Sequence, residues 1–144
     1  MRKIKESLSI VTACFNEETS IEYTLKRWLN YFKTKVRMSK FEIIITDDGS
    51  NDKTVEIIEK IKKKNKQIRL FRFKNNLGAS LAFNNSIRKA RYDHILINDA
   101  DNQFPIRNFV NMWDKLLLNN ADVVIGSRNR LKEVTFLSLG SYIS

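Results

Sequence analysis

The stretch FEIIITDDGS, residues 41–50, changes from apolar to polar within ten residues. Its first six residues form a continuous run rich in β-branched side chains, which is typical of a strand buried on both faces of a parallel sheet. The residues that follow are those favoured in tight turns, and Asp47 and Asp48 stand where the strand ends. The stretch therefore predicts a central parallel strand with two carboxylates at its carboxyl end.

Similar apolar runs occur along the rest of the chain. They predict further strands at residues 8–15, 68–73, 94–99 and 121–126. Between them, apolar side chains recur three or four residues apart, which predicts helices over residues 21–32, 55–61, 79–90 and 105–117. This alternation predicts an α/β protein with a doubly wound, mainly parallel, Rossmann-like sheet and right-handed crossovers.

Clusters of polar residues follow each predicted strand. They are FNEE, DDGS, KNNLG, DAD and GSRNR, which begin at residues 15, 47, 74, 99 and 126. The opposite ends of the strands, such as residues 38–40, lack this density of polar side chains. Because ligands of such sheets bind beyond the carboxyl ends of the strands, the clusters predict a site at that edge.

Asp99 and Asp101 are alternate residues at the end of a predicted strand. Two neighbouring carboxylates repel each other unless a cation lies between them. Carboxylates and substrate phosphates are the usual ligands of Mg²⁺ and Mn²⁺, and the amide oxygen of Gln103 can add to them. The alternative is that these residues only form a turn and cap the helix that starts at Pro105.

Other phosphate-binding patterns are missing. No G-x-G-x-x-G follows the first strand, where residues 12–17 read TACFNE, and there is no P-loop. A bound phosphate would therefore need Mg²⁺ or Mn²⁺, Arg128 and Lys74 as partners. Asp47 stands where nucleotide-binding α/β sheets often hold a ribose or base edge; its alternative role is in a tight turn before the next helix.

The composition excludes several classes of protein. The 144 residues suffice for one domain, and the single cysteine, Cys14, excludes an internal disulfide framework and suits a reducing, cytoplasmic environment. His94 is the only histidine, which argues against a zinc site. The net charge of +10 includes the run KIKKKNK at residues 60–66, which is either a solvated helix end or an attractor for an anion such as a nucleotide, lipid phosphate, acidic membrane or nucleic acid.

Five stretches in order resemble a family-2 glycosyltransferase with the GT-A fold, and within it the polyprenyl- (dolichol-) phosphate sugar transferases. The similar stretches are residues 9–25, 42–58, 72–90, 93–105 and 121–130. The resemblance implies a nucleotide-diphosphate sugar as donor and Mg²⁺ or Mn²⁺ as cofactor. It implies a hydroxyl or a lipid phosphate as acceptor, the latter at the inner face of the membrane.

The resemblance also implies roles for individual residues. Phe15, Asn16, Glu17, Asp47 and Asp48 would hold the base and ribose. Asp99, Asp101 and Gln103 would hold the metal, whose charge assists departure of the nucleoside diphosphate, so that the two aspartates are the catalytic residues. The remaining donor-binding residues are Lys74, Gly78 and Arg128.

Two departures from the family pattern stand out. Ala13 and Cys14 replace the Pro-Thr or Pro-Ser that often precedes the aromatic-Asn-Glu motif. Members of the family also continue well beyond the equivalent of Ser144, so residues 1–130 are expected to form a nucleotide-sugar-binding GT-A domain. Residues 131–144 would begin an acceptor region that is missing, and are expected to be poorly ordered or to depend on a partner copy in a homo-oligomer.

Two other hypotheses compete with an active transferase. The first is a nucleotide-sugar-binding module that lacks turnover because the acceptor half is absent. The second is a basic nucleic-acid-binding domain, which no helix-turn-helix or aromatic RNA-binding pattern supports, since Phe71 and Phe73 are predicted to be strand core. We therefore expect no nucleic-acid partner.

Overall fold

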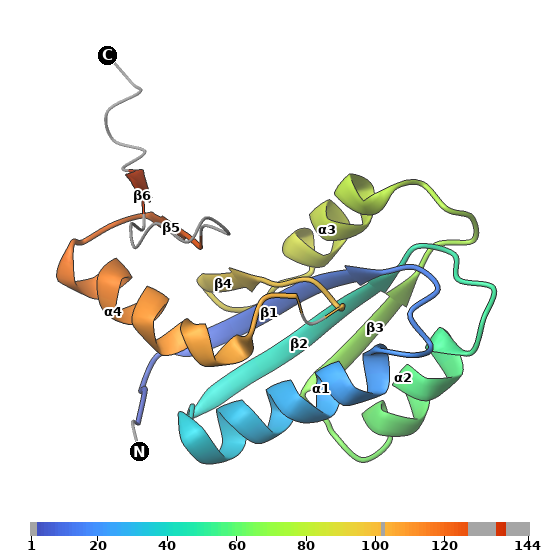
Figure 1. The fold of residues 1–144 in the computed structure, drawn as a ribbon, viewed down its shortest axis with the longest axis horizontal. Helices are drawn as coiled ribbons and strands as arrows, with labels where there is room; N and C mark the ends of the chain where they lie inside the picture. The colour runs from blue at the N-terminus through green and yellow to red at the C-terminus, as the bar shows by residue number, and fades with distance from the viewer. Residues whose placement is uncertain (1–2, 102, 127–134, 138–144) are drawn as a thin grey trace. The chain divides into compact units, whose positions relative to one another are not determined.

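A parallel sheet forms the centre of the first part of the chain (Figure 1). The computed structural model describes residues 3–101, 103–126 and 135–137. The chain divides into two units, Met1–Pro105 and Ile106–Ser144, and each is described by itself.

The first unit contains four parallel strands in the order β3-β2-β1-β4. They are β1 (Ser7–Cys14), β2 (Lys40–Asp47), β3 (Ile68–Arg72) and β4 (His94–Ile97). The first three are added in one direction, and the fourth lies on the other side of β1. The predicted α/β class with a doubly wound, mainly parallel sheet is thus confirmed, and the strand order reverses between β1 and β4.

Three helices connect these strands. On one face lie α1 (Ile21–Asn30), which continues as a π-helical turn over Tyr31–Lys35, and α2 (Thr54–Lys62); α3 (Ala79–Arg88) covers the other face (Figure 1). This distribution follows from right-handed crossovers, because a connection that changes direction must place its helix on the opposite face.

The core lies on both sides of β1 and β2. The apolar run predicted at the start is buried as expected: Ile43, Ile44 and Ile45 are fully buried. Trp28 of α1 is also fully buried. Burial of each such side chain contributes about 2 kcal/mol.

Polar groups fix the position of α3 on the sheet. The hydroxyl groups of Ser86 and Thr46 lie 2.7 Å apart, and Ser86 Oγ also donates to the carbonyl of Thr12 over 3.0 Å. Since both hydroxyls are buried, separating them would leave polar groups unsatisfied. This network holds the C-terminal half of α3 against β1 and β2.

The second unit begins with a short 3₁₀ turn, Ile106–Asn108, followed by α4 (Phe109–Leu118). The strand expected over residues 121–126 is observed as β5 (Val123–Ile125). It pairs antiparallel with β6 (Thr135–Leu137) and does not extend the four-stranded parallel sheet. A short apolar run predicts a strand but does not predict which strand it pairs with. The antiparallel pairing of β5 with β6 therefore could not be predicted from the sequence pattern.

Arg128 and most of residues 131–144 lie outside the described residues, so the domain boundaries proposed from sequence stay predictions. In the part of the chain that the structure describes, no helix has the length and apolar character needed to cross a bilayer.

Candidate functional site

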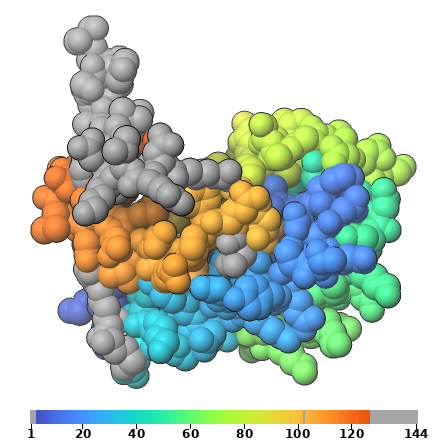
Figure 2. Space-filling model, viewed as in Figure 1, coloured from blue at the N-terminus to red at the C-terminus, as the bar shows by residue number. Residues whose placement is uncertain are grey.

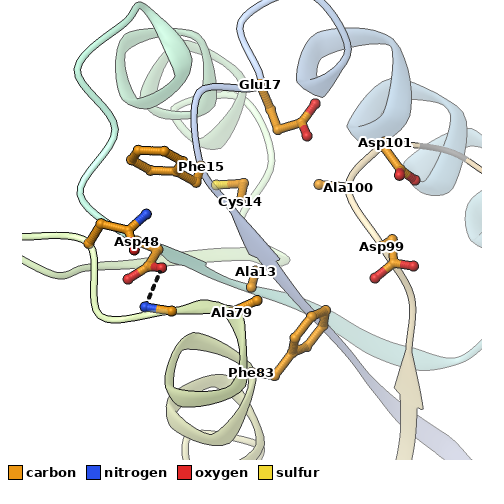
Figure 3. Close-up of a pocket in the computed structure, with 12 residues that line it drawn as sticks. Ala13, Cys14, Phe15, Glu17, Asp48, Ala79, Phe83, Asp99, Ala100 and Asp101 are labelled. Atoms are coloured by element: carbon orange, nitrogen blue, oxygen red, sulfur yellow. Dashed lines mark hydrogen bonds between the residues drawn. The ribbon is translucent and has the colours of Figure 1, made fainter.

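A cavity of about 300 Å³ opens at the carboxyl edge of the parallel sheet. Its volume lies at the lower end of the range for small-molecule sites. Four connections contribute to its wall, those that follow β1, β2, β3 and β4 (Figure 3). The lining residues are Ala13, Cys14, Phe15, Glu17, Asp48, Asn76, Gly78, Ala79, Phe83, Asp99, Ala100 and Asp101. The cavity therefore lies where the strand order reverses between β1 and β4, the position at which open α/β sheets bind ligands.

Asp99 and Asp101 both line this cavity, on the side opposite Asp48 in Figure 3. The chain directly after the pair is held in part by Asp101, whose Oδ1 accepts a hydrogen bond from the backbone N–H of Gln103 at 2.9 Å. The side chain of Gln103 is exposed and is not among the described lining residues, so its role as a metal ligand stays a prediction.

The cavity carries a concentration of negative charge. Glu17, Asp48, Asp99 and Asp101 line it, and none of its described lining residues is a lysine or arginine. A diphosphate would be repelled by this wall unless a cation intervened. No group of three or more potential ligands among the described His, Cys, Asp and Glu side chains could hold a metal by itself.

Two carboxylates are nevertheless a suitable donor set for Mg²⁺ or Mn²⁺. These ions are commonly bound through one or two carboxylates together with substrate phosphates. Asp99 and Asp101 are residues of the type that this arrangement requires, and both line the cavity.

The two aspartates of DDGS occupy different environments. Asp48 lines the cavity and is buried, and its two oxygens accept hydrogen bonds from the backbone N–H groups of Leu77 (2.8 Å) and Gly78 (2.9 Å). The bond to Gly78 is the dashed line in Figure 3. Asp48 therefore fixes the loop that leads into α3 and also presents its carboxylate to the cavity.

Asp47 is fully buried and is not one of the described lining residues. Its Oδ2 accepts from the backbone N–H of Ser50 (3.1 Å) and from Arg72 Nε (3.2 Å). Arg72 also donates to the carbonyl of Ser50 over 2.9 Å. Asp47 thus joins β3 to the loop after β2, while the base or ribose contact inferred for it stays a prediction.

Phe15, Asn16 and Glu17 follow β1 but do not all face the cavity. Phe15 and Glu17 line it, and Phe15 is 41% exposed. Asn16 lies between them with a φ of 55°, in the left-handed region that asparagine tolerates better than most residues. Its side-chain oxygen accepts from the backbone N–H of Asn51 (2.9 Å), so it contacts the neighbouring loop.

Of the three remaining donor-binding residues predicted from the sequence, one lines the cavity. Gly78 lines the cavity with a φ of 97°, and a Cβ placed there would meet no atom within 4 Å. Lys74 is exposed and is not among the described lining residues, and Arg128 lies outside the described part of the chain.

Sequence reasoning did not single out several residues of the wall. Ala79 and Phe83 lie four residues apart on the first turns of α3, so one face of that helix looks onto the cavity. The apolar spacing of these residues predicts a helix over residues 79–90. The spacing does not indicate that one face of this helix borders a cavity.

Cys14 is buried and also lines the cavity. Burial, and then the nearby Asp47 carboxylate, raise the pKa of the Cys14 thiol well above its usual range. The neutral thiol lies 3.9 Å from Asp47 Oδ1. This environment does not produce the reactive thiolate of a nucleophile.

A parallel α/β sheet with a cavity at its switch point is the arrangement in which open α/β proteins bind their ligands. Sequence comparison identifies the family: residues 9–140 match the glycosyl transferase family 2, and the chain belongs to that family. The family resemblance and the transferase class inferred from the sequence motifs are thereby confirmed.

The chain is similar in sequence to curated proteins with a different acceptor or product in their names. The chain is 40% identical over 96 residues to the poly-beta-1,6-N-acetyl-D-glucosamine synthase of Staphylococcus aureus, covering 67% of this chain and 22% of that protein. It is 30% identical over 144 residues to the dolichyl-phosphate beta-glucosyltransferase ALG5A of Trichomonas vaginalis, covering 95% of this chain and 45% of that protein. The chain thus spans less than half the length of either relative.

Solved structures share the fold. The mannosyltransferase PcManGT from Pyrobaculum calidifontis, solved with GDP-Man and Mn²⁺, is similar with a TM-score of 0.65 and 22% identity, covering 78% of this chain and 33% of that one. Staphylococcus aureus TarS 1–349 in complex with UDP-GlcNAc gives a TM-score of 0.60 and 24% identity, covering 76% of this chain and 31% of that one. These likenesses agree with the GT-A assignment of the sheet.

Proposed function

We propose that this chain binds the donor in a metal-dependent glycosyltransferase, which transfers a sugar from a nucleotide-diphosphate sugar to an acceptor. The observation that carries this proposal is the placement of Asp99 and Asp101 in one acidic cavity at the switch point of the sheet. An acidic wall suits an anionic donor only when a divalent cation is bound with it.

Proteins of similar fold support this assignment. PcManGT was solved with GDP-Man and Mn²⁺, and TarS with UDP-GlcNAc. We infer that the cavity of the present chain accepts the same class of donor, a sugar linked to a nucleoside diphosphate.

Each wall of the cavity has a part in the proposed mechanism. Asp99 and Asp101 would hold Mg²⁺ or Mn²⁺, which when bound offsets the charge on the departing nucleoside diphosphate. Phe15 offers an exposed aromatic ring to the base, and Asp48 holds the Gly78 backbone at the start of α3. The neutral Cys14 thiol adds no charge beside these carboxylates.

Two acceptor classes follow from the relatives. One relative is named for a dolichyl phosphate and the other for a polysaccharide of N-acetylglucosamine. We propose a polyprenyl phosphate at the inner face of the membrane as one acceptor and a sugar hydroxyl as the other. A lipid phosphate is already anionic and needs little deprotonation, so a site without a strong general base is adequate for it.

Nucleotide titration tests the proposal directly. UDP and GDP are titrated into the full chain by calorimetry with Mn²⁺ and again with EDTA, followed by a donor-hydrolysis assay. We expect one nucleotide to bind in Mn²⁺ at least about tenfold more tightly than in EDTA. The absence of binding to either nucleotide would overturn the proposal.

The hydrolysis assay addresses the second candidate function, a binding module without turnover. That candidate keeps the cavity and the proposed metal site but omits the transfer step. Metal-dependent binding with donor hydrolysis supports the transferase. Binding without hydrolysis, and without transfer to either acceptor class, supports the module.

A further inference from the structure

Hydrogen bonds outside the cavity join the loop after β1 to the loop after β2. Ser50 Oγ accepts from the backbone N–H of Asn16 (2.9 Å), and Thr54 Oγ1 accepts from the backbone N–H of Glu17 (2.7 Å). In the opposite direction, Asn16 Oδ1 accepts from the backbone N–H of Asn51 (2.9 Å). Figure 2 shows the blue segment after β1 lying against the blue-green segment after β2.

A second reciprocal pair extends this connection by one residue. The backbone N–H of Glu18 donates to Asp52 Oδ2 (3.1 Å), and the backbone N–H of Lys53 donates to Glu18 Oε2 (3.0 Å). Desolvation opposes ionisation of Asp52, but hydrogen bonds from Thr54 and Glu18 outweigh it and lower its pKa. Asp52 is therefore a carboxylate, and so a good acceptor, near neutral pH.

The two hydroxyl acceptors are buried, whereas the backbone they hold borders the cavity. Ser50 is 1% exposed and Thr54 is fully buried. The groups they bind belong to Asn16 and Glu17, the two residues directly after Phe15. Asn16 has a positive φ of 55°, and these bonds hold the backbone at Asn16 and at Glu17.

We propose that Ser50 and Thr54 are positioning residues for the nucleotide: they lie outside the cavity, and they hold Phe15 and Glu17 in its wall through the backbone of residues 16 and 17. This inference rests on the proposed function. It also gives Asn16 a role different from the direct donor contact expected from the sequence, since its side chain holds the neighbouring loop.

Paired substitutions at Thr54 test the inference. Thr54→Val keeps the β-branched shape and removes the acceptor for the Glu17 N–H, whereas Thr54→Ser keeps the acceptor. With UDP or GDP, whichever binds wild type, and Mn²⁺ in calorimetry, we expect affinity to fall about tenfold in Thr54→Val. Affinity should stay within about twofold of wild type in Thr54→Ser.

Ser50→Ala and Ser39→Ala form a second matched pair. Ser39 also joins two loops through its hydroxyl, which donates to the carbonyl of Lys5 (2.8 Å), but at the opposite edge of the sheet. We expect Ser50→Ala to weaken nucleotide binding about tenfold and Ser39→Ala to leave it unchanged. If Thr54→Val fails to fold, the comparison of Ser50→Ala with Ser39→Ala still tests the inference.

Amide hydrogen exchange separates positioning from general destabilisation. In Thr54→Val the Glu17 amide should exchange at least about tenfold faster, while amides of β1 and β2 keep their wild-type protection. Wild-type nucleotide affinity in both Thr54→Val and Ser50→Ala would overturn the inference alone. A wild-type chain that binds no nucleotide would overturn the proposed function and this inference with it.

Discussion

The two edges of the parallel sheet in residues 1–105 differ in the sign of their charge. The four connections at the cavity edge, residues 14–20, 47–54, 72–79 and 98–105, contain seven acidic and three basic residues. The segments at the opposite edge, residues 3–6, 31–40, 60–67 and 88–93, contain two acidic and fourteen basic residues. We call the latter the strand-start edge.

This difference changes the interpretation of the net charge. Helices α1, α2 and α3 end at the strand-start edge, where the partial negative charge of each helix terminus favours lysine and arginine. The surplus of positive charge therefore has a folding explanation. Because this surplus lies away from the cavity, it favours the solvated helix end among the two interpretations that the sequence left open, and it does not indicate an anion at the site.

The largest expected effect comes from Gly49, which is packed between loops of the cavity edge. A Cβ there would lie 2.6 Å from the backbone carbon of Asn75 and 2.8 Å from the nitrogen of Asn76, at a φ of 79°. We expect Gly49→Ala to lower the free energy of unfolding by roughly 3 to 4 kcal/mol, from overlap and backbone strain together. Urea denaturation measures this loss.

Gly78→Ala is the control for Gly49→Ala. Gly78 also has a positive φ, but a Cβ there meets nothing within 4 Å, so only strain of roughly 1 to 2 kcal/mol is expected. If both variants lose the same free energy of unfolding, close packing around Gly49 does not contribute to the stability of the cavity edge.

The next effect concerns the carboxylates of the cavity edge. Asp101→Asn removes one charge from the pair proposed to hold the metal, and we expect the Mn²⁺-dependent affinity for UDP or GDP to fall roughly 100-fold. The control is Asp93→Asn, which removes an exposed carboxylate from the strand-start edge. Calorimetry with Mn²⁺ and with EDTA compares them, and similar losses in both variants would contradict a specific metal site.

Much of the cavity edge could be predicted because strand ends follow directly from local patterns. The apolar run at residues 41–46 and the position of Asp99 after a strand depend only on periodicity and on the rule for switch points. The sequence therefore predicts that Asp48, Asp99 and Asp101 lie at one edge of the sheet, and the structure places all three in the wall of the cavity.

The contacts between loops could not be predicted in the same way. The bonds from Asn16 to Ser50 and from Glu17 to Thr54 join residues 34 and 37 positions apart, and each residue also suits an ordinary turn or helix start. The sequence pattern places Phe83 in a predicted helix and Arg72 in a predicted strand, and it predicts no contact for either residue. The antiparallel partner of β5 depends on residues that no local pattern connects.

Each edge also contains one buried carboxylate paired with an arginine, which allows a direct comparison. Next to the strand-start edge, near the starts of β3 and β2, Arg69 lies 2.8 Å from Glu42; at the cavity edge Arg72 lies 3.2 Å from Asp47. Arg69 is the more buried of the two and also donates to the carbonyl of Lys89 (2.7 Å). We expect Arg69→Gln to destabilise the fold by about 2 kcal/mol, and the half-exposed Arg72→Gln by about 1 kcal/mol.

Nucleotide affinity should respond in the opposite order. Arg72 holds the carbonyl of Ser50 (2.9 Å), so we expect Arg72→Gln to weaken binding a few-fold, by about 0.5 to 1 kcal/mol. Arg69→Gln should leave it unchanged at temperatures where the variant is folded. Weaker binding in Arg69→Gln than in Arg72→Gln would show that the two edges are coupled.

The smallest effect is expected from neutralising the strand-start edge itself. The triple variant Lys62→Gln, Lys63→Gln, Lys64→Gln removes three charges at the end of α2, where Lys62 forms a surface ion pair with Glu59 (2.9 Å). Such surface pairs contribute less than about 1 kcal/mol. Strand β1 has eight residues and spans about 26 Å between the edges, roughly three Debye lengths at physiological salt. Nucleotide affinity should therefore change less than about twofold at that salt concentration, because screening removes the interaction over this distance. A loss of fivefold or more that becomes smaller as the salt concentration is raised would contradict the electrostatic independence of the two edges.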